Sequence, residues 1–143
     1  MKKALSLFLF FSFFILSASA QRTSPIGKWK TVDDNTGKVK STVEIYEEGG
    51  KLFGKVLELF DPEKPDPVCE ECDEDDPRYM KPIVGMKLIR NMVKEDDKWE
   101  GGDITDPENG KVYRCKIWVE DGNLQVRGYI AFLYRTQTWL PAD

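Results

Sequence analysis

The feature that most constrains this chain is a series of short β-type runs separated by turn residues. The segment 112–119 shows the pattern, because Tyr113, Cys115, Ile117 and Val119 share one face of an extended strand. Arg114, Lys116 and Trp118 lie on the other face. Gly, Asn and Asp punctuate the runs, as in Asp121-Gly122-Asn123. This alternation predicts strands with one buried face.

The runs recur about every ten residues, and no amphipathic helix interrupts them. The segment 85–93 is ambiguous between strand and helix, but its β-branched and Met content favours a strand. The predicted fold class is therefore all-β, a small antiparallel meander barrel (or sandwich) of about eight strands. The expected strands are residues 26–32, 39–45, 52–60, 85–93, 99–105, 112–119, 124–130 and 132–140.

The first twenty residues have a different character. Met1-Lys2-Lys3 is basic, residues 5–16 are apolar, and Ala18-Ser19-Ala20 has the small residues that signal peptidase reads. We expect residues 1–20 to be cleaved, which leaves residues 21–143 as one domain that is secreted or periplasmic in a bacterial envelope. A retained N-terminal anchor is the alternative. Because cleavage removes two lysines, the formal net charge of -4 would become -6.

Charge and residue usage exclude several classes of function. An acidic chain is a poor candidate for a nucleic-acid partner, since phosphate binding needs a basic face. The N-terminal apolar run is too short for a membrane span. The chain contains no histidine, which excludes Ser-His-Asp and Cys-His catalysis and histidine metal sites. No catalytic residue, enzyme activity or cofactor is predicted.

One long segment, the acidic loop (residues 61–82), breaks the strand rhythm. It holds five prolines and nine acidic against three basic residues, so it cannot be a central strand. The favoured interpretation is a solvated, partly disordered excursion, and a functional loop is the alternative. The acids Asp73 to Asp76 offer oxygen ligands for Ca²⁺, but their spacing differs from an EF-hand and a solvated charge run is favoured.

Three cysteines leave several pairings open. Export implies an oxidising compartment, where at least two thiols should pair. A Cys69–Cys72 disulfide is favoured over a bond from either residue to Cys115, and over a three-thiolate metal site that lacks a fourth ligand. A redox role is disfavoured, because the surrounding acids oppose a thiolate.

The two ends of the chain carry a further pattern. Gly27-Lys28-Trp29 opens the first expected strand, and Arg135 lies on the last with Thr-Gln-Thr-Trp after it. In a closed barrel these strands become neighbours, so we expect Arg135 to lie over Trp29 and close one end through a cation–π contact of roughly 1–2 kcal/mol. A Gly-x-Trp near the start and an Arg near the finish resemble the lipocalin and wider calycin signature.

A longer set of motifs resembles the exported bacterial family known as domain of unknown function 2147. The resemblance covers essentially the whole mature chain, and it implies a lipocalin-like barrel with no established enzymatic activity. Family members often carry Gly where this chain has Tyr134, and Cys115 is not a general family feature. The motifs, in order, are Gly27-Lys-Trp-Lys-Thr, Asp33 through Thr-Gly-Lys to Ser41, Cys69-x-x-Cys72, Gly85-Met86, Trp99-Glu-Gly-Gly, Asp106-Pro107 with Gly110-Lys111 and Tyr113, Leu124 with Val126-Arg-Gly-Tyr129, and Arg135-Thr-Gln-Thr-Trp139.

Two functions follow from these patterns. The first is binding of a small apolar ligand inside the barrel or at its mouth, because eight strands leave room for side chains or one small ligand. The second is an envelope interaction or scaffold protein that acts through the acidic loop, with Ca²⁺ as an option and no identified protein partner. The expected cavity walls of the first are Val43, Ile45, Tyr113, Ile117, Val126 and Ile130.

Overall fold

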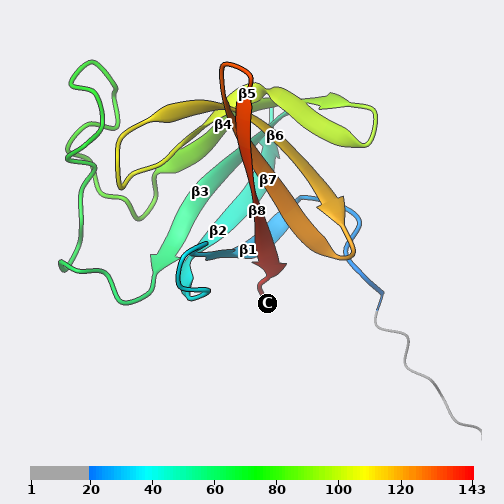
Figure 1. The fold of residues 1–143 in the computed structure, drawn as a ribbon, viewed down its shortest axis with the longest axis horizontal. Coiled ribbons are helices and arrows are strands. Elements are labelled where there is room, and N and C mark those ends of the chain that lie inside the picture. The colour runs from blue at the N-terminus through cyan, green and yellow to red at the C-terminus, as the bar shows by residue number, and fades with distance from the viewer. Residues whose placement is uncertain (1–19) are drawn as a thin grey trace, which may run out of the picture.

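The computed structural model describes residues 20–143, which form one closed antiparallel barrel. The expected signal peptide, residues 1–20, lies outside the described residues apart from Ala20. Each strand pairs with the next along the chain, and the last pairs with the first (Figure 1). The strands are β1 (Gly27–Val32), β2 (Val39–Glu48), β3 (Lys51–Leu59), β4 (Lys87–Glu95), β5 (Lys98–Thr105), β6 (Val112–Glu120), β7 (Asn123–Ile130) and β8 (Leu133–Pro141).

The all-β barrel expected from the alternating runs is confirmed. All eight runs became strands, including the ambiguous segment 85–93, which overlaps β4. Side chains alternate between the interior and the outer surface along β6 and β7, as the two-residue period requires. Within residues 20–143, no helix is long and apolar enough to cross a bilayer.

One end of the barrel is sealed by large apolar side chains. Three tryptophans lie there on the inner face, at the start of β1, the start of β5 and the end of β8. Register places Trp29 opposite Val43, Trp99 opposite Ile117, and Trp139 opposite Leu124. These residues are buried within a single core, where each fully buried large side chain contributes about 1.5–3 kcal/mol. We call this end the base.

The seam between the first and last strands is short. Only two residue pairs join β1 to β8, whereas seven join β7 to β8. An arginine that precedes β1 reinforces this seam: Arg22 donates hydrogen bonds to Lys28 O (2.8 Å) and Ala142 O (2.7 Å). Its guanidinium carbon also lies 5.0 Å from the ring centre of Trp29.

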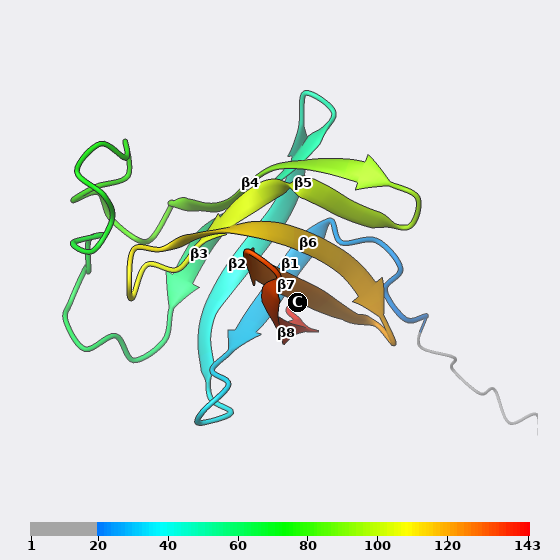
Figure 2. The same ribbon diagram turned by 45° about the horizontal axis from the view of Figure 1, so that its top comes forward.

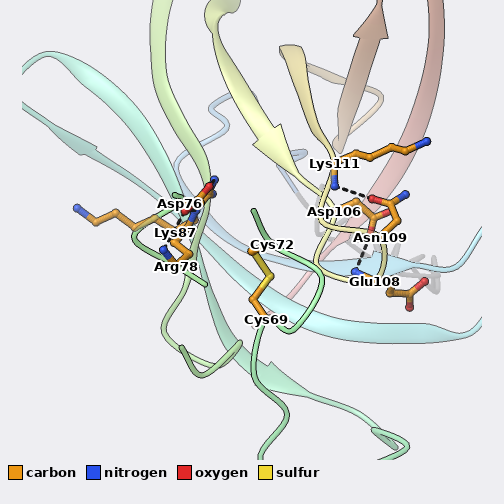
Figure 3. Close-up of a disulfide and its surroundings, with 9 residues drawn as sticks. All are labelled: Cys69, Cys72, Asp76, Arg78, Lys87, Asp106, Glu108, Asn109 and Lys111. Carbon is orange, nitrogen blue, oxygen red and sulfur yellow. Dashed lines mark hydrogen bonds and ion pairs between the residues drawn. A yellow bond between two sulfur atoms is a disulfide. The ribbon is translucent and has the colours of Figure 1, made fainter. Parts of the chain in front are cut away.

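The acidic loop is ordered and attached to the barrel, unlike the disordered excursion expected from its composition. Cys69 and Cys72 form a disulfide, and Val68 pairs with Pro82 to tie the two halves of the loop together. Gly110 of the β5–β6 turn packs against the loop, because a Cβ there would lie 1.7 Å from Glu71 O. Figures 2 and 3 show the loop beside this turn. These backbone contacts, which composition does not encode, hold the loop in place.

Candidate functional site

The end opposite the base is less tightly filled, and we call it the open end. It is formed by the ends of β1, β3, β5 and β7 and by the starts of the strands that follow them. At the β5–β6 side of this end the inward-facing Ile104 and Tyr113 are only partly buried, although Ile89 at the start of β4 is buried. The three tryptophans of the base are all buried. The barrel is therefore asymmetric along its axis.

The expected cavity residues divide into three groups. Val43, Ile45, Ile117 and Val126 are buried in the core, and their role in ligand binding stays a prediction. Tyr113 is half-buried at the open end. Ile130 is 51% exposed at the rim of the open end, and its role in a cavity wall also stays a prediction. It lies one residue beyond the last β6–β7 pair and is opposite Leu133 of β8.

Two hollows among the described residues lie outside the barrel. A hollow of about 470 Å³ follows the outer face of β1, β2 and β3 beside the C-terminus. A second, of about 410 Å³, lies between the acidic loop and the start of β4. None of the expected cavity residues lines either one. A ligand inside the barrel therefore has to enter at the open end and displace side chains there.

Tyr113 occupies the interior of the open end. Gly128 of β7 makes room for it, because a Cβ on that glycine would lie 3.3 Å from the Tyr113 Cβ and 3.9 Å from Ile104. The hydroxyl of Tyr113 accepts a hydrogen bond from Asn109 Nδ2 (3.3 Å), in the β5–β6 turn. The aromatic ring thus fills the entrance, with its polar end at the rim.

The β5–β6 turn (residues 106–111) extends over the open end. Glu108 Oε1 lies 2.7 Å from Lys40 Nζ of β2. In the sheet β3 and β4 separate β2 from β5, so this ion pair bridges the opening rather than following the sheet. Both side chains are largely exposed, and such a pair contributes only about 0–1 kcal/mol. The turn is therefore a cover that is weakly held on its β2 side.

A polar network forms another part of the rim. Asp34 Oδ2 lies 2.5 Å from Arg135 Nη2 and accepts a hydrogen bond from Gln137 Nε2 (3.2 Å). Gln137 in turn accepts from Trp139 Nε1 (3.1 Å) near the base. Asp34 and Gln137 were not expected at a site. The only sequence signal at Asp34 is the turn cluster that contains it, and Gln137 is set only by its register on β8.

The expected contact of Arg135 with Trp29 is wrong. Arg135 faces inward on β8 opposite Gly128, but it lies at the open end, where it is 67% exposed. Trp29 lies at the base, one barrel length away from it along the strands. Arg22 takes the expected position over Trp29. Arg135 and Trp29 lie on adjacent strands, but the antiparallel register places them at opposite ends of the barrel.

The thiols offer no reactive site. Because Cys69 and Cys72 form a disulfide, the pairing with Cys115 and the three-thiolate metal site are both ruled out. Cys115 is buried on the inner face of β6, and burial raises the pKa of its thiol to about 12. The proton therefore stays on the sulfur at neutral pH.

Asp76 of the acidic loop takes part in attaching the loop to β4. Asp76 accepts hydrogen bonds from Arg78 Nε and Nη2, at 2.9 and 2.7 Å, and these bonds lower the pKa of Asp76 to about 2. Arg78 also donates to Lys87 O on β4 (2.9 Å; Figure 3). Within residues 20–143 no group of three acidic or thiol side chains is placed to hold a metal ion. The Ca²⁺ alternative gains no support from this geometry, and a protein partner for the loop stays a prediction.

Comparison with known proteins agrees with this architecture. Residues 27–140 match the family model described as "Uncharacterized protein conserved in bacteria (DUF2147)". Among solved structures, the chain is similar to a protein from the human pathogen Helicobacter pylori that is described as belonging to the lipocalin family. The two share 18% sequence identity over 85% of each chain, with a TM-score of 0.72. The comparison with curated proteins gives no match.

Proposed function

We propose that this chain, which belongs to the bacterial DUF2147 family, is an exported lipocalin-like protein that binds one small, largely apolar ligand at the open end of its barrel. The observation that carries the proposal is the asymmetry of the interior. The base is sealed by buried tryptophans, whereas the β5–β6 side of the open end holds a half-buried tyrosine beneath a weakly held turn. A barrel of eight strands has room for no more than one small ligand.

The walls of the open end define the chemistry of the ligand. Ile104, Val126 and the ring of Tyr113 offer apolar surface, which favours a hydrocarbon or aromatic body. At the rim, the exposed Arg135 guanidinium donates to Asp34 through Nη2, and its remaining N–H groups can donate to a polar end of the ligand. We therefore expect an amphipathic ligand, such as a short fatty acid, with its carboxylate at Arg135.

Binding requires the tyrosine ring to move. Tyr113 packs on Gly128, so its ring can swing away only toward the rim, where it is held by one long hydrogen bond from Asn109. The β5–β6 turn above it is fastened toward β2 by the Glu108–Lys40 ion pair. Removing this pair should let a ligand enter faster with little change in stability.

The test is titration with the fluorescent fatty acid cis-parinaric acid. We expect saturable binding of one probe per chain. Tyr113→Ala, which empties the entrance, should tighten binding, whereas Gly128→Val, which fills it, should weaken binding at least about tenfold. Thermal unfolding monitors that both variants remain folded. Val93→Ser, on the exposed surface of β4, is the matched control and should bind like the unmodified protein.

Two further measurements sharpen this test. Glu108→Gln should speed probe association in stopped flow and leave the unfolding temperature nearly unchanged. Arg135→Gln should reduce the preference for the fatty acid over the corresponding alcohol. Absence of saturable binding by a folded protein, or equal binding by Gly128→Val and the unmodified chain, would rule out a ligand site at the open end.

Export is tested separately. Fractionation of cells that produce the full chain should recover it outside the cytoplasm, with Gln21 as the N-terminal residue. Recovery of an uncleaved cytoplasmic chain would contradict export without bearing on ligand binding.

A further inference from the structure

The turn between β7 and β8 differs from every other hairpin turn in residues 20–143. It consists of Ile130, Ala131, Phe132 and Leu133, and it contains no polar side chain. Phe132 is 88% exposed and Leu133 is 64% exposed, and the adjacent Tyr134 is 61% exposed. The turns 33–38, 48–51, 95–98, 106–111 and 120–123 all hold acidic residues, most of them together with Gly or Asn.

The backbone of this turn favours a different kind of residue. Ala131 has a φ of 50°, a left-handed conformation that Gly, Asn and Asp adopt most readily. The corresponding positions of two hairpin turns at the base are Asp96 and Asp121, with φ of 54° and 52°. With Ala in place of those residues, the β7–β8 turn exposes an unbroken apolar surface. We call Ile130 to Tyr134 the apolar tip.

Positive charge surrounds the apolar tip in an otherwise acidic chain. Residues 123–141 contain two arginines and no acidic residue, although the whole chain has 25 acids against 21 bases. Arg114 of β6 donates to Ala131 O (2.8 Å), directly behind the tip. Arg127 lies 4.3 Å from the ring centre of Tyr134. Within the described residues neither Arg114 nor Arg127 forms an ion pair, so both of these charges remain uncompensated, whereas Arg135 pairs with Asp34.

We propose that the apolar tip docks the barrel on an anionic lipid surface. Phe132 and Leu133 would insert among the acyl chains, Tyr134 would lie at headgroup depth, and Arg114 and Arg127 would contact lipid phosphates. The β7–β8 hairpin rises at the top of Figure 1 and comes toward the viewer in Figure 2, so the tip projects from the barrel. A projecting wedge with apolar residues on both faces suits a fluid bilayer.

A second copy of the chain fits this surface less well. The exposed apolar side chains of the tip offer about 500 Å², taking 150–250 Å² for each large side chain when fully exposed. A stable dimer needs about 800 Å² from each partner. The lone arginines behind the tip would also repel one another across a two-fold interface. An anionic bilayer satisfies both the apolar and the charged parts of the surface, and this inference does not depend on ligand binding.

The experiment measures binding of the chain from Gln21 to Asp143 to vesicles by co-sedimentation. Vesicles of phosphatidylcholine that contain phosphatidylglycerol should bind the protein, and vesicles of phosphatidylcholine alone should bind it weakly. Combined Phe132→Ser and Leu133→Ser should reduce binding at least about tenfold, because the apolar anchor is lost. Val93→Ser removes an apolar residue that is 46% exposed on another face, and it should leave binding unchanged.

The charged part is tested by Arg114→Gln with Arg127→Gln, which should abolish the preference for anionic vesicles. Raising the salt concentration should do the same in the unmodified protein, independently of any folding defect. Two outcomes overturn the proposal. One is equal vesicle binding by the serine variant and the unmodified chain, or no binding by either. The other is a dimer in solution that the serine variant dissolves while vesicle binding stays absent, which would show that the tip pairs two copies.

Discussion

Replacing Arg22 should weaken the closure of the barrel much more than replacing Arg135. The reason is the short seam, in which only two residue pairs join β1 to β8. Arg22 adds a hydrogen bond to each side of this seam, at Lys28 O on β1 and at Ala142 O just after β8. It also covers the indole of Trp29. Arg22→Ala removes all three interactions in one step.

The size of the effect follows from these contacts. A hydrogen bond from a charged group contributes about 1.5–3 kcal/mol when buried, and less here because one of the two bonds is exposed. The cation–π contact adds about 0.5–1 kcal/mol at a partly exposed site. We therefore expect Arg22→Ala to lower the free energy of unfolding by about 2–3 kcal/mol. Arg135→Ala loses an exposed pair with Asp34, for which we expect about 0–1 kcal/mol.

The assay is urea unfolding followed by tryptophan fluorescence, with hydrogen exchange as a local readout. For a slope of about 1.5 kcal/mol per molar urea, Arg22→Ala should lower the urea midpoint by about 1.3–2 M. The amide of Ala142, which donates to Lys28 O (3.0 Å), should lose protection more than the amides of β6. Arg22→Lys keeps the charge and should recover part of the loss. Equal midpoints for Arg22→Ala and the unmodified protein, or a larger shift for Arg135→Ala, would refute the reasoning.

Three further predictions concern the loop and the buried thiol. The pKa of Asp76 in the folded protein is about 2, below the ordinary 3.8, so its carboxylate stabilises the fold above pH 4 and loses this effect as the pH falls toward 2. The Asp76→Asn variant should therefore be less stable than the unmodified protein by about 1–2 kcal/mol at neutral pH. In thermal unfolding, the difference between the two proteins should vanish near pH 2. Gly110 has a φ of 71°, and a Cβ there would clash with Glu71 O, so Gly110→Ala should lower the free energy of unfolding by about 3 kcal/mol or more. Gly37 has a φ of 70° but open space around it, so Gly37→Ala should lower the free energy of unfolding by about 1–2 kcal/mol in the same assay. Cys115 should resist iodoacetamide at pH 8 until urea unfolds the chain, as followed by mass spectrometry; labelling of the folded protein at the rate of a free thiol would contradict its burial.

The strands could be predicted from the sequence because their signal is local. Alternation in segments such as 112–119, together with turn residues such as Gly122, reports which side chains are buried without knowledge of the partner strand. The disulfide between Cys69 and Cys72 also followed from nearness along the chain and from the acidic surroundings that disfavour other roles. The strand order was predictable because consecutive strands with short turns pair with each other.

The candidate site was only partly predictable. Tyr113 was expected to face inward, and it does, but its position at the entrance depends on Gly128 in the adjacent strand. Ile130 follows the same alternation as Val126, yet it is exposed because it lies at the end of β7, one residue beyond the last pair with β6. The ion pair of Glu108 with Lys40 joins elements that lie far apart in the sequence. No local pattern reports such contacts.

The identity of the arginine that closes the barrel could not be predicted from local sequence patterns. The alternation and the end motifs were enough to give an eight-stranded barrel with Trp29 on its first strand, because each depends on residues a few positions apart. The strand register then placed Arg135 at the open end, and the guanidinium of Arg22 contacts Trp29 instead. The same three-dimensional packing ordered the acidic loop against Gly110 and left the apolar tip uncovered. These positions could be known only from the tertiary structure, because they depend on where each strand ends relative to its neighbours. The pairing of the whole sheet sets those end points.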